Sequence, residues 1–192
     1  MAINDEALDV IFRSARTHRH WLDKPVSPAL LMAIYDLLRW GPTSGNCNPM
    51  RVVFVVSPEA KARLKPLLAS GNVEKTMTAP ATAILGYDLD FGRFKNVLSP
   101  KSASFASPDL AANEVTAFRN GSLQGAYFII AARALGLDCG PMSGFDNAGV
   151  DAEFFARTAV KSNFLCNLGY GDAAKLYPRG GRLSFDEACT IA

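Results

Sequence analysis

The hydrophobic positions of the chain alternate between helical spacing and short unbroken runs, which predicts a fold of both helices and strands. Residues 5–14 and 28–40 carry apolar side chains three and four positions apart, the spacing of one helix face. Ser27-Pro28 supplies the cap and the first-turn proline of a helix start, and Gly41-Pro42 is typical of a helix end. We therefore expect two helices joined by a loop.

Short runs rich in β-branched residues predict strands at 51–56, 81–87 and 162–169. A helix is expected between the first two strands, over residues 58–68. The Gly71-Asn72 pair that follows is expected to break the helical pattern.

Residues 109–135 form the longest helical pattern, and Gly136 is the residue type that ends such a helix. The second half of this pattern is apolar almost all round, which predicts a central, buried helix. A short strand is expected at 137–142 and a short helix at 147–155. Strands interspersed with helices indicate an α/β or α+β sandwich.

Two segments lack periodicity. Residues 88–108 are predicted to form a long loop or lid, and residues 170–192 a polar, looped tail with a final amphipathic turn. No repeat or linker divides the chain, and its 192 residues suit one domain. We therefore expect residues 1–192 to form a single domain.

Composition and charge narrow the class of protein. Lys and Arg number 20 against 18 Asp and Glu, and this net charge of +2 does not favour a nucleic-acid partner. No run approaches the ~18 apolar residues of a membrane span, and no signal peptide is visible, so we expect a cytoplasmic protein with no membrane partner. The cysteines are expected to be free thiols; they are Cys47, Cys139, Cys166 and Cys189.

Two motifs point to chemistry that their context does not support. The run Gly169–Ala174 matches the dinucleotide-binding fingerprint, but only 18 residues follow it, too few for the helix and second strand of that fold. The two histidines, His18 and His20, have no carboxylate or thiol at ligand spacing nearby. Neither a Rossmann fold nor a metal site is therefore predicted.

Groups that bind anions and planar rings recur in the loops. Guanidinium groups of the basic loop Arg16–Trp21 match phosphate oxygens, although a solvated charged loop would have the same composition. Residues 42–46 and 141–146 form tight turns through which backbone can approach a ring, and Arg179 and Arg182 add positive charge. Because no carboxylate pair or nucleophile–base pair accompanies these loops, we expect a cofactor to carry the chemistry.

Four segments occur in an order that resembles a known family: Arg16–His20, Gly41–Pro49, Gly140–Asp146 and Leu168–Asp172. The order resembles that of the FMN-dependent nitroreductase family, and the resemblance covers nearly the whole chain. It is closest to the branch that contains malonic semialdehyde reductase, an enzyme of uracil catabolism. The runs that resemble this branch in particular are Ala134–Asp146 and Arg182–Ala188.

The resemblance implies an α+β, nitroreductase-like fold, in which helices flank a central, mostly antiparallel sheet. It also implies an intertwined homodimer with two FMN sites at the subunit interface. The implied reaction moves a hydride from NADH or NADPH through flavin N5 to a small acceptor, with malonic semialdehyde (3-oxopropanoate) reduced to 3-hydroxypropanoate. Two alternatives stay open: an NAD(P)H nitroreductase or quinone reductase of broad acceptor range, and a flavin-binding protein without turnover.

The resemblance also implies which residues hold FMN. Arg16 would bind the FMN phosphate, assisted by Arg179 and Arg182. The neighbours that would line the phosphate and the ring are Thr17, His18 and His20. A turn from the other subunit would hold the dimethylbenzene side and the ribityl chain. Its residues are Pro42, Thr43, Ser44 and Asn46.

The implied catalytic residues are Lys75, Ser143 and Gly144. Asn72 and Lys75 would contact the pyrimidine end of the ring, where Lys75 would stabilise negative charge on N1–C2=O of the reduced flavin. The Ser143-Gly144 turn would aim a backbone N–H at flavin N5. The residues before that turn that would also contact the cofactor are Pro141 and Met142. The family often has Ser at position 18, Glu at 143 and Lys at 180, where this chain has His, Ser and Gly.

Overall fold

A four-stranded antiparallel sheet forms the centre of the chain in the computed structural model, which describes residues 2–98, 104 and 106–192. The strand order is β1-β2-β4-β3. The strands are β1 (Met50–Val55), β2 (Ala81–Asp88), β3 (Asp138–Met142) and β4 (Val160–Gly169). The predicted α+β class with an antiparallel sheet is confirmed, and each predicted strand forms within two residues of its expected bounds.

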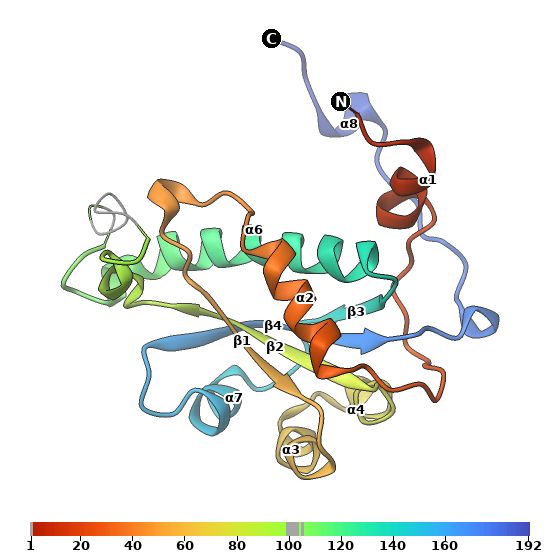
Figure 1. Ribbon diagram of the computed structural model, residues 1–192, viewed down its shortest axis with the longest axis horizontal. Coiled ribbons are helices and arrows are strands. Elements are labelled where there is room, and N and C mark those ends of the chain that lie inside the picture. The colour runs from red at the N-terminus through yellow and green to blue at the C-terminus, as the bar shows by residue number, and fades with distance from the viewer. Residues whose placement is uncertain (1, 99–103, 105) are drawn as a thin grey trace.

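Helices cover both faces of the sheet (Figure 1). One face carries α2 (Pro28–Leu38) and α6 (Glu114–Ala134). The other carries α3 (Pro58–Leu64), α4 (Ser70–Met77) and α7 (Asn147–Phe154). The molecule is therefore a three-layer sandwich, helix on sheet on helix.

The alternation of side chains along β2 divides the core into two halves. Leu85 packs on one face with Ile34 of α2 and Phe128 of α6. Ile84 packs on the other face with Leu64 of α3. Because β2 is buried along its whole length, its apolar run ATAIL reads as unbroken in the sequence.

The start of α2 was correctly predicted from its cap, whereas α6 begins at Glu114, five residues after its predicted start, and α4 was not predicted. The side chain of Ser27 accepts a hydrogen bond from the amide of Leu30, and Pro28 occupies the first turn. The prediction that Gly71-Asn72 breaks the helical pattern is wrong, because both residues lie inside α4. A glycine inside a helix costs only about 1 kcal/mol relative to alanine, which the tertiary hydrogen bonds of α4 described below can offset.

Shorter elements fill the connections. At the N-terminus α1 (Asp5–Leu8) continues into a π-helical turn, η1 (Asp9–Arg13), and near the C-terminus α8 (Phe185–Ala188) is the expected final turn. The 3₁₀ turns are η2 (Ser44–Asn46), η3 (Lys65–Leu67), η4 (Phe91–Phe94), η5 (Ala111–Asn113) and η6 (Ala173–Lys175). The predicted lid over 88–108 contains η4, whereas residues 99–103 and 105 of that prediction lie outside the described part of the chain.

The central helix α6 is buried on one side only. The face that lies on the sheet includes Phe128 and the fully buried Ala117. The opposite face leaves large apolar side chains 40–65 % exposed in the single chain; they are Val115, Phe118, Leu123 and Tyr127. The expectation of a helix buried all round is therefore not met within one chain.

Candidate functional site

The basic loop Arg16–Trp21 runs beside the β3 edge of the sheet. Thr17 forms a parallel bridge with Cys139 of β3, and the amide of His18 donates to the Cys139 carbonyl over 3.0 Å. A Cβ atom added at Gly140 would lie 2.6 Å from the carbonyl oxygen of His18. Only glycine at position 140 therefore lets the loop approach the strand this closely.

The imidazole of His18 points into the protein interior. The residue is 5 % exposed, and its Nε2 lies 3.4 Å from Oδ1 of Asp138. The other carboxylate oxygen of Asp138 accepts a hydrogen bond of 2.8 Å from the amide of Gly171. A Cβ atom at Gly171 would collide with the imidazole ring. In this arrangement the His18 side chain anchors the loop, and its expected part in lining a phosphate stays a prediction.

Helix α4 is tied to a second segment of the predicted site, the Ser143-Gly144 turn. Asn72 donates through Nδ2 to the carbonyl of Gly144 over 2.6 Å, and the amide of Ala69 donates to the same oxygen over 3.0 Å. The backbone amides of Ser143 and Gly144 donate no hydrogen bond within the described residues. Two adjacent N–H groups are thus available to an external acceptor.

The same helix is tied to the basic loop at Lys75. The Lys75 carbonyl accepts from the indole Nε1 of Trp21 over 2.9 Å and from Nδ2 of Asn167 over 3.1 Å. Burial and the nearby charge of Arg19 lower the pKa of the Lys75 ammonium below its usual value. The structure therefore brings three predicted segments together: the basic loop, the Asn72–Lys75 helix turn and the turn at Ser143-Gly144.

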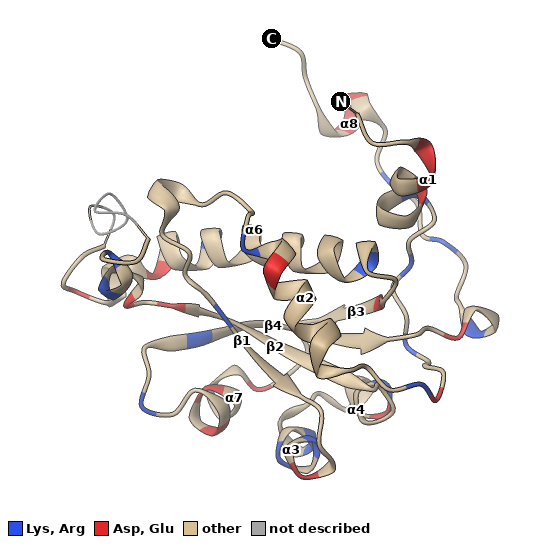
Figure 2. Cartoon of the chain, viewed as in Figure 1, with Lys and Arg blue, Asp and Glu red and all other residues tan. Residues whose placement is uncertain are grey.

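The C-terminal segment crosses the basic loop and adds cations to it. Arg16 donates to the backbone carbonyl of Tyr177, and the guanidinium of Arg19 lies 5.2 Å from the centre of the Tyr177 ring. Arg179 donates to the carbonyls of Arg13 and Ala15 over 2.9 and 3.0 Å. Figure 2 shows how basic residues recur along these loops.

Within the described residues, Arg16, Arg19 and Arg179 have no carboxylate at ion-pair distance. Several cations without counter-charges form a surface that suits an anion such as a phosphate. Arg182 also has no carboxylate at ion-pair distance among the described residues, but its guanidinium is turned back on its own segment, where it donates to the carbonyls of Gly180 and Gly181. Its assignment as a phosphate ligand stays a prediction.

The Pro42–Asn46 turn is attached to a different part of the fold from the basic loop. The amide of Ser44 donates to Oδ1 of Asn120 in the N-terminal half of α6 over 2.8 Å. The basic loop pairs with β3, which begins after α6 has ended at Ala134. Cys139, the residue that bridges to the loop, lies against the Ile129 carbonyl of α6, nine residues beyond Asn120 and therefore roughly 14 Å along the helix at 1.5 Å per residue. One chain therefore does not bring this turn to the basic loop.

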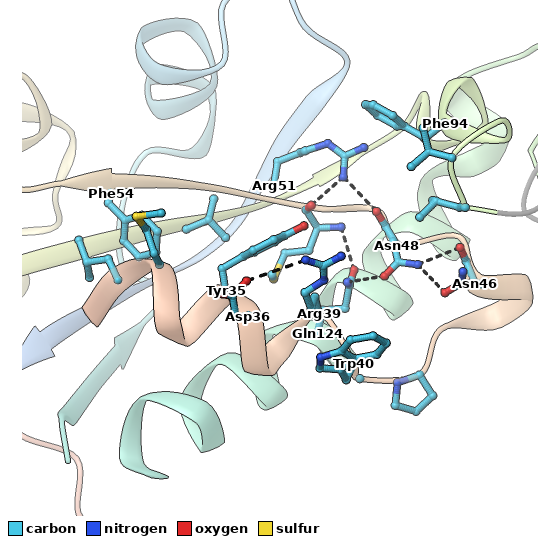
Figure 3. A pocket seen from close by; sticks show the side chains of 18 of the residues that line it. Tyr35, Asp36, Arg39, Trp40, Asn46, Asn48, Arg51, Phe54, Phe94 and Gln124 are labelled. Atoms are coloured by element: carbon cyan, nitrogen blue, oxygen red, sulfur yellow. Dashed lines mark hydrogen bonds and ion pairs between the residues drawn. The ribbon is translucent and has the colours of Figure 1, made fainter. Parts of the chain in front are cut away.

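A groove of about 930 Å³ opens beside the Pro42–Asn46 turn, between α2, β1 and η4 (Figure 3). Its lining includes Tyr35, Arg39, Trp40, Arg51 and Phe94, together with Pro42 and Asn46. None of the first five residues was predicted from the sequence as part of a site, because they are separated along the chain and match no motif.

A buried carboxylate behind this groove holds Arg51, one of the residues that line it. Asp88, at the end of β2, is fully buried, and its Oδ2 lies 2.8 Å from a guanidinium nitrogen of Arg51 and 2.8 Å from one of Arg93. The centre of the Phe94 ring lies 4.6 Å from the Arg51 guanidinium and 4.7 Å from that of Arg93. Asp88 therefore joins β1, β2 and η4 at one point.

The described part of the chain holds neither a metal-binding cluster nor a membrane-spanning helix. Among residues 2–98, 104 and 106–192, no three His, Cys, Asp or Glu side chains gather closely enough to hold a metal ion. No helix in those same ranges is both long enough and apolar enough to cross a bilayer.

Known proteins resemble this chain along nearly its whole length. A protein of Stenotrophomonas maltophilia, named as an NADH dehydrogenase/NAD(P)H nitroreductase, is 59 % identical over 194 residues, covering 100 % of this chain and 98 % of the relative. A protein of Burkholderia lata with the same name is 59 % identical over 192 residues, covering 98 % of each.

Solved structures share the fold at low identity. A nitroreductase of Exiguobacterium sibiricum in complex with FMN superposes with a TM-score of 0.84 at 19 % identity, covering 100 % of this chain and 99 % of that one. A nitroreductase of Bacillus subtilis gives a TM-score of 0.84 at 18 % identity, covering 98 % and 100 %. The family model described as the nitroreductase family matches residues 12–170. Together, the match of that model and the close relatives show that this chain belongs to the nitroreductase family.

Proposed function

We propose that this protein is an FMN-dependent NAD(P)H oxidoreductase that acts as a homodimer of single-domain subunits and reduces a small acceptor. The observation that carries the proposal is the junction of the basic loop, α4 and the Ser143-Gly144 turn. Uncompensated cations, an ammonium and two unused backbone amides meet there. Such a set suits an anionic tail and a ring that carries hydrogen-bond acceptors. The His18–Asp138 pair of the loop is turned inward and His18 is buried, so a bound cofactor is left to carry the chemistry.

FMN fits the groups present at this junction. Its phosphate would be held by Arg16, with Arg179 beside it, since both guanidinium groups lack a carboxylate partner among the described residues. The unused amides of Ser143 and Gly144 would donate to the ring, and Lys75 would lie at its pyrimidine end. Bound FMN would supply the relay of a hydride between NADH or NADPH and the acceptor.

Groups of the chain have three tasks in this proposal. The arginines bind the charged tail and so fix the ring in place, because small errors in position cost about 10²-fold in rate. The backbone amide of Gly144 would donate a hydrogen bond to the ring. The ammonium of Lys75 would offset negative charge at the pyrimidine end of the ring.

The homodimer is supported by surfaces that a single chain leaves uncovered. The outer face of α6 exposes Val115 and Phe118, and α2 exposes Met32 and Trp40, the last two by 70 and 78 %. Large apolar side chains that gather exposed on a surface are typical of interfaces. Both termini, with α1 and α8, also project away from the body of the chain (Figure 1). Within one chain the Pro42–Asn46 turn does not reach the junction, whereas the same turn of a second subunit would.

For the acceptor we propose malonic semialdehyde, reduced to 3-hydroxypropanoate, on the strength of the branch-like runs Ala134–Asp146 and Arg182–Ala188. The names of the relatives favour a second candidate, an NAD(P)H nitroreductase or quinone reductase of broad acceptor range. The two differ in whether a small aldehyde or a quinone or nitro compound is the better acceptor.

Anaerobic flavin titration tests the proposed function. The purified protein is expected to be yellow, to lose its colour when NADH or NADPH is added without oxygen, and to regain it with malonic semialdehyde. A colourless protein that does not bind added FMN would refute the proposal. If neither nucleotide reduces the bound flavin, the protein binds flavin without turnover. If only quinones reoxidise the reduced flavin, the second candidate is favoured.

Replacing Lys75 with methionine tests its role in stabilising charge. The midpoint potential of the bound flavin is expected to fall by about 30 mV, equivalent to ~1.4 kcal/mol for two electrons, because the reduced ring loses a nearby positive charge. The apo protein should unfold at the same temperature or higher, since burial and Arg19 disfavour the charged lysine. Spectroelectrochemistry checks the potential, with Lys65→Met as the control; an unchanged potential would remove Lys75 from the mechanism.

A further inference from the structure

The segment Thr43–Asn48 adopts a backbone shape that its residues do not favour by themselves. Gly45, Asn46 and Asn48 have φ angles of 55°, 57° and 42°, in the left-handed region. Residues with a side chain adopt this region rarely, asparagine more often than most. Two such asparagines and a glycine within four residues therefore need neighbouring groups to hold them.

Two buried amide side chains of α6 provide this support. Asn120 accepts through Oδ1 from the amide of Ser44 over 2.8 Å. Gln124, one turn later, accepts through Oε1 from the amide of Met50 over 2.9 Å and donates through Nε2 to Oδ1 of Asn48 over 3.2 Å. Figure 3 shows Gln124 reaching Asn48, which in turn donates to Asn46.

Burying these two side-chain amides would cost folding free energy if they did not hydrogen-bond to the turn. Asn120 and Gln124 are 1 and 4 % exposed, on the helix face that otherwise buries small and apolar residues such as Ala117 and Phe128. Burying a primary amide among apolar groups is unfavourable without hydrogen bonds. Three of the four hydrogen bonds that these side chains make go to residues 44–50, and the fourth joins Asn120 to the Thr116 carbonyl.

We propose that Asn120 and Gln124 are positioning residues that hold the Thr43–Asn48 turn of one subunit in the shape that contacts the flavin of the other subunit. The inference rests on the proposed function, which assigns the turn to the neighbouring site. Without the two amides the turn would relax toward ordinary backbone angles. Flavin binding would then have to reorder it, which weakens affinity without removing any direct contact.

The first experiment measures flavin affinity and thermal stability together. Asn120→Leu and Gln124→Met are each expected to raise the FMN dissociation constant by about tenfold or more, because a buried backbone amide loses its acceptor. Asn120→Asp keeps an oxygen for the Ser44 amide and should lie closer to the wild type than Asn120→Leu. The measurement is FMN fluorescence quenching with apo protein, beside the melting temperature of each variant.

A matched control separates positioning from simple destabilisation. Asn163 donates to Oγ of Ser122 over 2.9 Å, so it also joins α6 to the rest of the fold but does not touch the turn. Asn163→Ala is expected to lower the melting temperature and leave flavin affinity within twofold of the wild type. Equal loss of affinity in this control, or unchanged affinity in Asn120→Leu, would overturn the inference.

The second experiment tests action across the subunit boundary. Arg16→Ala chains are co-expressed with Asn120→Leu chains, each with its own tag, and the mixed dimer is isolated. If the turn contacts the flavin of the neighbouring subunit, the altered Arg16 position and the altered turn lie in the same site. The second site then has both groups intact and binds FMN with wild-type affinity. If the turn serves its own chain, both sites are defective and the inference fails. Wild-type protein that binds no FMN would refute the proposed function itself, a result distinct from either.

Discussion

Replacing Asp88 with alanine is expected to lower the free energy of unfolding by about 3–5 kcal/mol, the usual cost of removing one partner of a buried ion pair. Asp88 is fully buried between Arg51 and Arg93, each with a guanidinium nitrogen 2.8 Å from its carboxylate. Burial already lowers the pKa of the Arg51 guanidinium, an effect that the charge of Asp88 opposes. Without Asp88, the cost of burying Arg51 is uncompensated.

Differential scanning calorimetry at matched protein concentration measures this effect. A loss of this size corresponds to a fall of roughly 10 °C in melting temperature for a chain of this length. Asp90→Ala is the control, because Asp90 is 44 % exposed and 3.4 Å from Arg93, and exposed ion pairs contribute about 0–1 kcal/mol. A melting temperature for Asp88→Ala within 2 °C or so of that control would contradict the assigned role.

Replacing Arg16 with alanine is expected to yield protein that purifies mostly without flavin. The proposed function gives Arg16 the FMN phosphate, and losing a charge-assisted hydrogen bond of this kind weakens binding by roughly 10- to 100-fold. The Arg16 guanidinium is held only by the carbonyl of Tyr177 among the described residues, so its removal should cost little stability. The ratio of flavin to protein absorbance after purification measures occupancy.

Arg63→Ala is the matched control for this experiment. Arg63 lies on α3, where it forms a half-exposed ion pair with Glu153 away from the basic loop. Its replacement should leave flavin occupancy unchanged. Full occupancy in Arg16→Ala would remove Arg16 from the phosphate site, whereas equal loss in both variants would point to a general effect on folding.

The fold could be predicted from the sequence where local chemistry decides local structure. The strand at Met50–Val55 follows from its β-branched residues, and the start of α2 follows from Ser27-Pro28. Helix α4 could not be predicted, because Gly71-Asn72 is a poor helix sequence by itself. Its hydrogen bonds to Gly144 and Trp21 come from segments distant in the chain.

The same division applies to the candidate site. Arg16 and the Ser143-Gly144 turn carry their chemistry in short motifs, so the sequence indicates them directly. Asp88 was not predicted, because its role depends on arginines from β1 and η4 that only the fold brings together. Gln124 was not predicted either, because within a helical pattern it is indistinguishable from an ordinary polar position.

The contact between His18 and Gly171 couples the substitutions that these two positions can accept, although they lie far apart in the sequence. The imidazole occupies the volume that any side chain at 171 would need, so neither residue can change freely while the other stays. A relative with serine at the position of His18 has room for alanine at that of Gly171, and a relative with a large residue at the first should keep glycine at the second. Side-chain volumes at these two positions should therefore covary across the family, with a small residue at one wherever the other is large.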